Sequence, residues 1–227
     1  MAIIERYIPL AGRRVLDLGC GLGEYVRAFA REGARTVGLD VARDRLVEGR
    51  RRGAEDLLLG VGESLPFATA ALDVVVLNEV IEHVTDDRAT MREVARVLAP
   101  GGIAVIYAPN RLYPFETHGI YLGKRYVFGN IPFVNWLPNI LRNRLVPHAR
   151  AYTERGIKHV AGASGLSIVD HSYVYPGFDN IAARLPLLAR FLRAACYRAE
   201  DSEALRRFGL SHLLVLRREP QAESTHQ

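Results

Sequence analysis

The chain of 227 residues is poor in sulfur and has no long apolar segment. Its two cysteines, Cys20 and Cys196, cannot form the bridges that staple small secreted domains, which favours a reducing compartment. No apolar run reaches the roughly 18 residues that a membrane-spanning helix needs. The first residues, MAIIERYIPLAGRR, lack the apolar run and cleavage site of a signal peptide. We therefore expect a cytoplasmic protein, with peripheral attachment to a membrane as the alternative.

Lysine is almost missing as well. Lys124 and Lys158 are the only lysines among 30 basic residues, and 25 acidic residues leave a net charge of +5. So mild a charge is compatible with nucleic acid, an anionic lipid or an acidic small molecule, and it does not choose among them. A hydrophobic content of 49% is typical of a globular protein, and this length suits one α/β domain.

Strand-like apolar runs alternate with helical stretches along most of the chain. We expect strands at 14–18, 36–39, 56–61, 73–77, 103–108, 166–174 and 211–216 and helices near 24–30, 43–52, 86–98, 153 onward and 181–198. This alternation is typical of βαβ units around a parallel sheet. The segment 111–150 interrupts it with four prolines and no clear period. We predict a single α/β domain over 1–219 with an insertion at 111–150 and a disordered tail at 220–227.

A glycine-rich turn follows the first strand in the sequence DLGCGLG. Glycines there permit a tight turn and a close approach of a ligand to the backbone. Asp40 ends the second strand, where a carboxylate can accept hydrogen bonds from both hydroxyls of a ribose. The spacing G-x-G-x-G after an acid differs from the G-x-G-x-x-G of dinucleotide enzymes. These features predict a site for a nucleoside-containing ligand.

Five segments carry a family resemblance: VLDLGCGLGEY (15–25), GLD (38–40), GESLPF (62–67), LDVVVLNEVIEHV (72–84) and LAPGGIAVIYAPN (98–110). Together they resemble the motifs of class I S-adenosylmethionine-dependent methyltransferases. The likeness is to the small-molecule branch that includes methyltransferase type 11 and the ubiquinone-biosynthesis O-methyltransferases. The resemblance implies an enzyme with a Rossmann-like, doubly wound sheet of seven mostly parallel strands, helices on both faces and a substrate lid after the fifth strand. A scaffold or regulatory subunit is the non-enzymatic alternative, and the intact Asp17 and Asp40 argue against it.

The resemblance also implies which residues hold S-adenosylmethionine. The methionine end is expected at Asp17, Gly19 and Gly21, and the ribose at Asp40. The remaining positions expected at the cofactor are Cys20, Val41, Gly62, Glu63 and Asn78, with Gly62 and Glu63 beside the adenine and Asn78 near the sulfonium. Family members often carry an acid at the position of Val61, which contacts the adenine amino group. Val61 offers only its backbone and an apolar side chain at that position.

The segment after the fourth strand carries the candidate catalytic groups. If this turn is helical, Glu79 shares a face with Glu82 and His83, and such groups can ligate a divalent ion. His118 is a fourth candidate ligand. The E-x-x-E-H pattern resembles two metal-using branches, the ubiquinone-biosynthesis O-methyltransferases and the small-RNA 2′-O-methyltransferases, in which the metal lowers the pKa of the acceptor hydroxyl. The alternatives are a metal-free enzyme with His83 or His118 as base, or catalysis by positioning alone.

The insertion 111–150 is rich in aromatic and basic side chains. It holds 7 of the 19 aromatic residues and six basic residues against one acid, Glu116. These side chains could form a pocket for an apolar acceptor, a membrane-surface patch or a platform for RNA bases; a small satellite core with solvated arginines is the structural alternative. A basic amphipathic stretch at 185–193 suits either a membrane surface or a helix that covers the sheet.

We therefore predict O-methylation of a hydroxyl on a small-molecule or lipid-linked acceptor, such as a quinone precursor, polyketide or glycosyl group, with or without a divalent metal such as Mg²⁺. Methylation at nitrogen or carbon of a metabolite is one alternative. An RNA 2′-O-methyltransferase is the other. Nucleic acid is disfavoured, because a more basic chain and an accessory binding module are expected for it.

Overall fold

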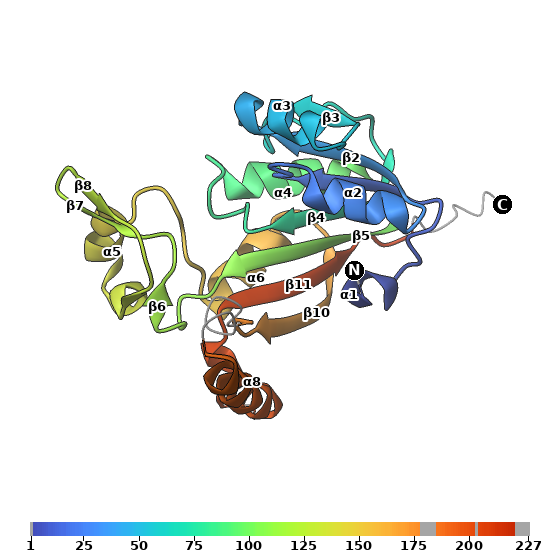
Figure 1. The fold of residues 1–227 in the computed structure, drawn as a ribbon. Coiled ribbons are helices and arrows are strands. Elements are labelled where there is room, and N and C mark those ends of the chain that lie inside the picture. Colours follow the sequence, from blue (N-terminus) through green and yellow to red (C-terminus); the bar gives the residue numbers. More distant parts are fainter. Residues whose placement is uncertain (1, 178–184, 203, 221–227) are drawn as a thin grey trace. The chain divides into compact units, whose positions relative to one another are not determined.

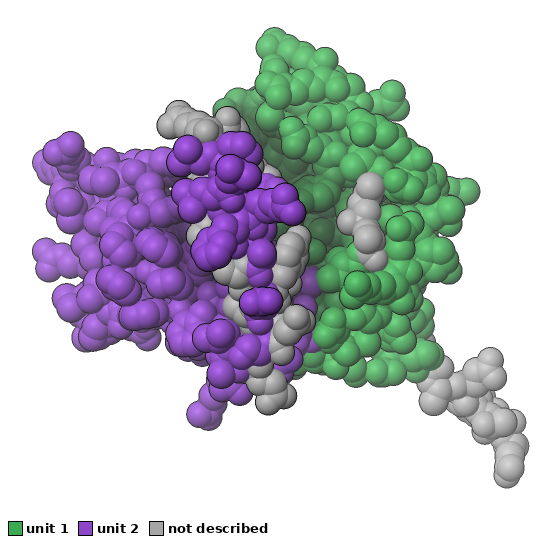
Figure 2. Space-filling model, turned by 60° about the horizontal axis from the view of Figure 1, so that its bottom comes forward, with its two compact units in different colours: residues 1–107, 157–170, 214–227 green, residues 108–156, 171–213 purple. Residues whose placement is uncertain are grey.

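The computed structural model describes residues 2–177, 185–202 and 204–220. The chain forms two compact units (Figure 2). Unit 1 comprises Met1–Tyr107, Ile157–Asp170 and Leu214–Gln227, and unit 2 comprises Ala108–Gly156 and His171–Leu213. Compactness alone does not make two domains, so the single domain over 1–219 stays a prediction. The predicted tail 220–227 lies outside the described residues apart from Pro220.

Seven strands form the main sheet, as predicted. They are β1 (Arg14–Leu18), β2 (Arg35–Asp40), β3 (Leu57–Leu59), β4 (Leu72–Asn78), β5 (Leu98–Pro109), β10 (Ser167–Val174) and β11 (Ser211–Arg217). Their order is β10-β11-β5-β4-β1-β2-β3, and the pairs β1–β2, β2–β3, β1–β4 and β4–β5 are parallel. The order in which strands are added to the sheet reverses between β1 and β4, because β2 and β3 lie on one side of β1 whereas β4 and β5 lie on the other. Ligands of doubly wound sheets bind at the carboxyl ends of strands at such a point.

Helices cover both faces of the sheet (Figure 1). Parallel crossovers are right-handed, so α2 (Glu24–Arg31) and α3 (Arg43–Arg51), which lead from β1 toward β3, lie on one face. α4 (Asp87–Val97), which leads from β4 to β5, lies on the other. α4 begins where the Asp86 side chain accepts a hydrogen bond from the backbone of Ala89 at 2.9 Å, a standard N-cap. Two further helices are α1 (Ala2–Glu5), near the start of the chain, and α6 (Glu154–Gly162), which precedes β10.

The core follows from the apolar strands. Val15, Leu16, Val74, Val75 and Leu77 are fully buried, because helices on both faces leave these strands no solvent-facing side. Each such side chain contributes roughly 1.5–3 kcal/mol by its burial.

Two strands differ from the predictions by more than one residue at an end. The third strand was expected over 56–61, but β3 spans only Leu57–Leu59, because it is the edge strand and pairs with β2 through three residues. The fifth strand was expected over 103–108, but β5 begins at Leu98, which pairs with Leu72 before a shift in register. Tertiary pairing, rather than the local apolar pattern, sets both boundaries.

Unit 2 contains the whole predicted insertion. The antiparallel pairs are β6 (Phe115–Glu116) with β9 (Ile131–Pro132) and β7 (Ile120–Leu122) with β8 (Arg125–Val127). Among its described residues, unit 2 also contains the longer helix α8 (Pro186–Asp201) and the short helices η1 (Val134–Trp136), α5 (Asn139–Leu145) and η2 (Arg206–Phe208). Elements this short show no period in sequence. Residues 181–184 of the helix predicted over 181–198 lie outside the described residues. Among the described residues, no helix is long and apolar enough to cross a membrane.

Candidate functional site

The glycine-rich turn after β1 adopts a backbone that needs glycine. Gly19, Gly21 and Gly23 have φ angles of 76°, 53° and 69°, in the left-handed region that residues with a Cβ atom avoid. Gly19 is also sterically required, because an added Cβ would clash with the Val80 side chain. The turn is therefore shaped by backbone constraints close to the start of α2.

Asp40 ties this turn to the end of β2. Its Oδ2 accepts a hydrogen bond from the backbone of Gly21, and its Oδ1 accepts one from the backbone of Ala42, both at 2.8 Å. Each carboxylate oxygen has further lone pairs. Asp40 is thus oriented by the backbone and keeps acceptor capacity for two hydroxyls, as a ribose site requires.

Asp17 has a buried carboxyl group whose pKa is strongly shifted. It is 2% exposed, and its Oδ2 has no hydrogen-bond partner among the described residues. Burial, together with the negative charge of Asp40, raises the pKa of Asp17 to about 7. A buried carboxyl oxygen without a hydrogen-bond partner is costly, and a cationic ligand group placed against it would remove that cost.

A pocket of about 630 Å³ opens beside these groups, entirely within unit 1. Small-molecule sites commonly measure roughly 300–1,000 Å³. Of the predicted cofactor residues it is lined by Gly19, Asp40, Val41, Gly62 and Glu63. The lining also includes both Glu79 and His83 of the predicted catalytic set.

Four predicted cofactor residues do not line this pocket: Asp17, Cys20, Gly21 and Asn78. The Cys20 side chain packs in a core cluster with Val26 and Leu46, and burial raises the pKa of its thiol to about 12. Only the backbone of Cys20 is therefore suited to a cofactor contact. The Nδ2 of Asn78 donates a hydrogen bond to the Tyr25 hydroxyl at 3.4 Å.

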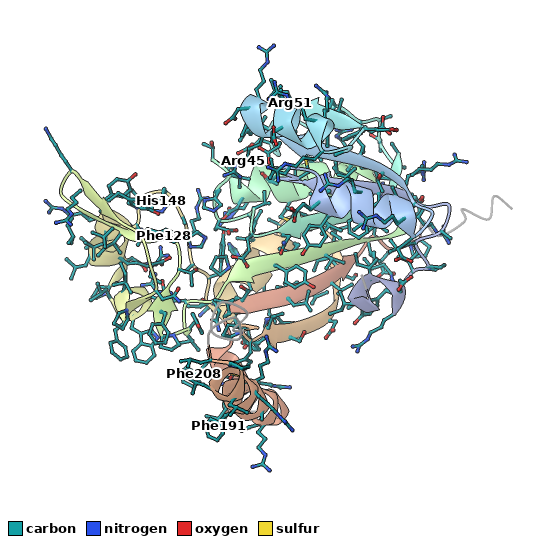
Figure 3. All side chains as sticks on the ribbon, in the orientation of Figure 1. Arg45, Arg51, Phe128, His148, Phe191 and Phe208 are labelled. Carbon is teal, nitrogen blue, oxygen red and sulfur yellow. The ribbon has the colours of Figure 1, made fainter. Side chains whose placement is uncertain are left out.

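The sequence analysis missed several residues at this site. Ala42, Asp44, Arg45, Val84 and Thr85 line the pocket, and Arg45 projects from the first turn of α3 (Figure 3). For Ala42, Asp44 and Arg45 the available signal was their position directly after Asp40, and for Val84 and Thr85 it was their position directly after His83. Glu63 also has a role that the sequence did not reveal. Its Oε1 accepts backbone hydrogen bonds from Thr85 (2.7 Å) and Asp86 (3.1 Å), which links the loops after β3 and β4.

The turn after β4 is not helical. Glu79 has a φ of 54°, and the backbone of His83 donates a hydrogen bond to the Val80 carbonyl at 2.9 Å. The argument from helical spacing therefore fails for Glu79. Glu82 and His83 nonetheless lie together, with 3.7 Å between Glu82 Oε1 and His83 Nε2. The Glu82 carboxylate is buried, whereas His83 is exposed over 43% of its side chain.

His118, the other predicted catalytic histidine, belongs to unit 2. Its Nδ1 lies 3.0 Å from Oε1 of Glu116. Burial by itself would raise the pKa of Glu116, but the hydrogen bonds from His118 and the charge of Arg142 outweigh it and hold that pKa below its ordinary value. Glu116 is therefore a buried, ionised partner of His118. From the sequence it was visible only as the single acidic residue of the insertion.

Comparison with known families identifies the kind of domain that contains the pocket. Residues 16–106, which run from β1 to β5, match the methyltransferase domain family. This match identifies residues 16–106 as a methyltransferase domain. The domain is that of an enzyme, and its family implies S-adenosylmethionine as the cofactor. Asp17 fits the ammonium group of that cofactor, and Asp40 fits its ribose.

Curated proteins of similar sequence match part of this chain. The chain is 35% identical over 136 residues to a ubiquinone biosynthesis O-methyltransferase of Sodalis glossinidius, a match that covers 57% of this chain and 54% of that protein. The chain thus spans about half the length of the curated relatives it matches. What those whole proteins do is therefore relevant to this chain only as a hypothesis.

Solved structures show the same fold. An S-adenosylmethionine-dependent methyltransferase from Mesorhizobium loti has a TM-score of 0.67 at 22% identity, covering 96% of both chains. The cyclase SpnF has a TM-score of 0.62 at 23% identity, covering 96% of this chain and 79% of its own. One of these neighbours is a cyclase, so the fold of a methyltransferase domain does not by itself determine the reaction.

Proposed function

We propose that the protein transfers the methyl group of S-adenosylmethionine to a hydroxyl oxygen of a small-molecule or lipid-linked acceptor. The observation that carries this proposal is the buried Glu82 carboxylate beside His83, which lines the cofactor pocket. Transfer to oxygen is the reaction that most needs such a pair, because a hydroxyl must lose its proton to react well. The names of the curated relatives add support, since they are O-methyltransferases.

The chemistry itself is a single displacement. The acceptor oxygen forms a bond to the methyl carbon while the carbon–sulfur bond breaks, and the bonding pair stays on sulfur to give S-adenosylhomocysteine. Because the sulfonium brings its own leaving group, the protein mainly has to align the two reactants. The hydroxyl proton passes to a histidine, His83 or His118. At His83, the Glu82 carboxyl oxygen Oε1 lies 3.7 Å from Nε2 and can orient the ring.

The carboxylates and imidazoles predicted at this site can also act as ligands of a divalent cation. Carboxylate oxygens and imidazole nitrogen suit Mg²⁺, Mn²⁺, Fe²⁺ or Zn²⁺, and the predicted ligands are Glu79, Glu82, His83 and His118. When bound, such an ion supplies Lewis acidity that lowers the pKa of the acceptor hydroxyl. Metal-assisted and metal-free transfer are thus two forms of one proposed reaction.

Analysis of the methylated products tests the proposed reaction. The protein is incubated with S-adenosylmethionine and a panel of acceptors that contains catechol, a prenylated dihydroxybenzoate, amines and a short RNA, and the products are read by mass spectrometry. The proposal expects a methyl ether of a phenol or alcohol. An N-methyl, C-methyl or RNA product, or no product from any acceptor, contradicts it.

If a metal assists, excess chelator abolishes turnover, and His83→Ala and His118→Ala behave alike. Without a metal, chelator has no effect and only one of the two histidine variants is inactive. Binding of S-adenosylhomocysteine, measured by calorimetry, serves as the control in every case, because the groups expected to hold it are Asp17 and Asp40.

We further propose that α8 docks on an anionic membrane surface that carries a lipid-linked acceptor. Leu187 and Phe191 are 81% and 71% exposed, and Phe191 projects from α8 into solvent (Figure 3). Arg190 and Arg198 are exposed on the same helix. Apolar and basic side chains side by side suit the boundary between lipid headgroups and acyl chains.

Liposome flotation tests this docking. The protein is expected to float with vesicles that contain anionic lipid, and less so with purely zwitterionic vesicles, since each basic residue near an anionic surface adds about 1 kcal/mol. The double variant Leu187→Ser with Phe191→Ser should lose flotation, whereas Leu58→Ser with Leu59→Ser, on the exposed edge strand β3, should not. Equal recovery of the wild type on both vesicle types would refute an electrostatic contribution.

A further inference from the structure

His118 lies between β6 and β7, outside any regular secondary structure, yet it is held from several sides. Its backbone nitrogen donates a hydrogen bond to Glu116 Oε1 at 2.9 Å, and its ring Nδ1 lies 3.0 Å from the same oxygen. Its carbonyl oxygen accepts a hydrogen bond from the Tyr126 hydroxyl at 2.6 Å and lies 3.1 Å from His148 Nε2. All of these residues belong to unit 2.

Glu116 is itself fixed by a buried arginine. Arg142 Nη2 donates to Glu116 Oε2 at 2.8 Å, and the two side chains are 1% and 2% exposed. The other nitrogens of Arg142 donate to Asn135 Oδ1 at 3.1 Å and to the Ala149 carbonyl at 2.9 Å. The guanidinium thus has an acceptor for each of its three nitrogens, and both carboxylate oxygens of Glu116 have donors.

Such a pair is a poor way to stabilise a small unit. A buried ion pair often contributes no more to stability than apolar side chains of the same volume. The best-supported use of buried charges is to impose one arrangement on their neighbours. The neighbour held by this pair is His118, because Glu116 Oε1 contacts both its backbone and its ring.

The contact also determines which ring nitrogen carries the proton. A carboxylate that already faces an arginine and a backbone N–H is an acceptor, so the ring nitrogen that faces it must be a donor. In the neutral imidazole only one nitrogen is protonated. The lone pair therefore lies on Nε2, away from Glu116.

We propose that Glu116 is a positioning residue: it holds His118 in the Nδ1–H form, so that Nε2 is the nitrogen that acts on the acceptor hydroxyl. The pair Arg142–Glu116 forms the support behind it. Carboxylates behind a working histidine commonly fix its tautomer and orientation in this way. The part of this inference that concerns the acceptor rests on the proposed methyl transfer, whereas the tautomer does not.

Nitrogen-15 NMR of the full-length protein tests the tautomer directly. At a pH where the imidazole is neutral, the wild-type His118 signal is expected to show protonated Nδ1 and unprotonated Nε2. In Glu116→Gln the amide can donate as well as accept, so a substantial population with protonated Nε2 is expected. The matched control is Glu154→Gln, because Glu154 also lies beside a histidine, His171, with 3.8 Å between Oε1 and Nδ1. This control should leave the His118 signal unchanged.

The wild-type measurement stands even if Glu116→Gln fails to fold, and a wild-type ring protonated on Nε2 would overturn the inference. With catechol, or whichever panel acceptor the wild type methylates, Glu116→Gln should lower kcat by about 10- to 100-fold. Affinity for S-adenosylhomocysteine should be unchanged. An unchanged kcat in a folded variant would overturn the positioning role. If the wild type methylates no acceptor, the proposed function fails, and the NMR result still decides whether Glu116 sets the tautomer.

Discussion

At the scale of single residues, Asp17 and Asp40 lie beside the same glycine turn but differ in how many hydrogen bonds their carboxyl groups accept. Asp40 accepts two backbone hydrogen bonds, whereas Asp17 Oδ2 has none among the described residues. We therefore predict that Asp40 is oriented before the cofactor binds and that Asp17 Oδ2 gains a partner only on binding. The two residues should respond differently to substitution and to pH.

For Asp40, replacement by alanine removes charge-assisted hydrogen bonds to the ribose, each worth about 1.5–3 kcal/mol. We expect Asp40→Ala to weaken S-adenosylmethionine binding by roughly 10- to 100-fold, from the same energies. Isothermal calorimetry measures this change. Asp40→Asn, with one acceptor oxygen left, should show a smaller loss. Unchanged affinity in a folded Asp40→Ala variant would remove Asp40 from the cofactor site.

For Asp17, the pKa of about 7 predicts a pH dependence with a definite sign. The ordinary pKa is 3.8, so the folded state binds more protons than the unfolded state between these values. The stability of the protein without ligand should therefore fall as pH rises from about 4 to about 7. The slope of unfolding free energy against pH, measured by urea titration, should be reduced in Asp17→Asn.

Cofactor binding should show the opposite trend. The ammonium of the cofactor favours the ionised Asp17, so binding below pH 7 releases a proton, and affinity should rise by up to about tenfold per pH unit toward 7. Calorimetry at pH 6 in buffers of different ionisation enthalpy counts the proton. If Asp17→Asn releases as many protons as the wild type, Asp17 is not the group responsible.

At the scale of elements, the start of α2 depends on how closely it packs against a neighbouring segment. A Cβ atom at Gly23 would lie 2.6 Å from the Ala54 Cβ, and the residue has a φ of 69°. Gly53 has a φ of 83° but has nothing within 4 Å of an added Cβ. The pair therefore separates steric crowding from backbone strain.

We expect Gly53→Ala to destabilise the protein by about 1–2 kcal/mol through its left-handed backbone alone. Gly23→Ala should cost about 1–3 kcal/mol more, because it also overpacks the contact with Ala54. Urea titration of both variants gives the difference. Equal losses would mean that the contact relaxes at no cost.

At the scale of the whole molecule, the predicted lid is a set of short elements with a small core of its own. Ile120, Val134, Val146 and Ala149 form that core, which is far smaller than the one around β1 and β4. Low local stability is typical of segments that close over substrates.

We therefore expect backbone amides in 111–150 to exchange faster than those of Val74–Leu77 in the absence of ligand. Addition of S-adenosylhomocysteine and an acceptor should slow the exchange in 111–150, and hydrogen exchange followed by mass spectrometry measures both effects. The strand β4 serves as the internal reference. Equal protection of both segments, with and without ligand, would contradict the prediction of a lid.

The sequence by itself determined most of the sheet and the glycine turn beside Asp17 and Asp40, where the cofactor is predicted to bind. Continuous apolar strands, the glycines between 19 and 23 and the acid that ends β2 are local features, because each depends on burial or backbone conformation at that position. Hence β1, β4 and the Asp17–Asp40 pair could all be predicted. The short elements of the insertion 111–150 could not, because strands of two or three residues leave no period.

Tertiary structure alone decided the partners of the predicted catalytic groups. The turn after β4 is not helical, since Glu79 takes a left-handed backbone there. Arg142 reaches Glu116 across 26 positions of the chain, a separation that no local pattern encodes. A buried charge must find its counter-charge within the fold, and only the folded chain shows where that counter-charge lies.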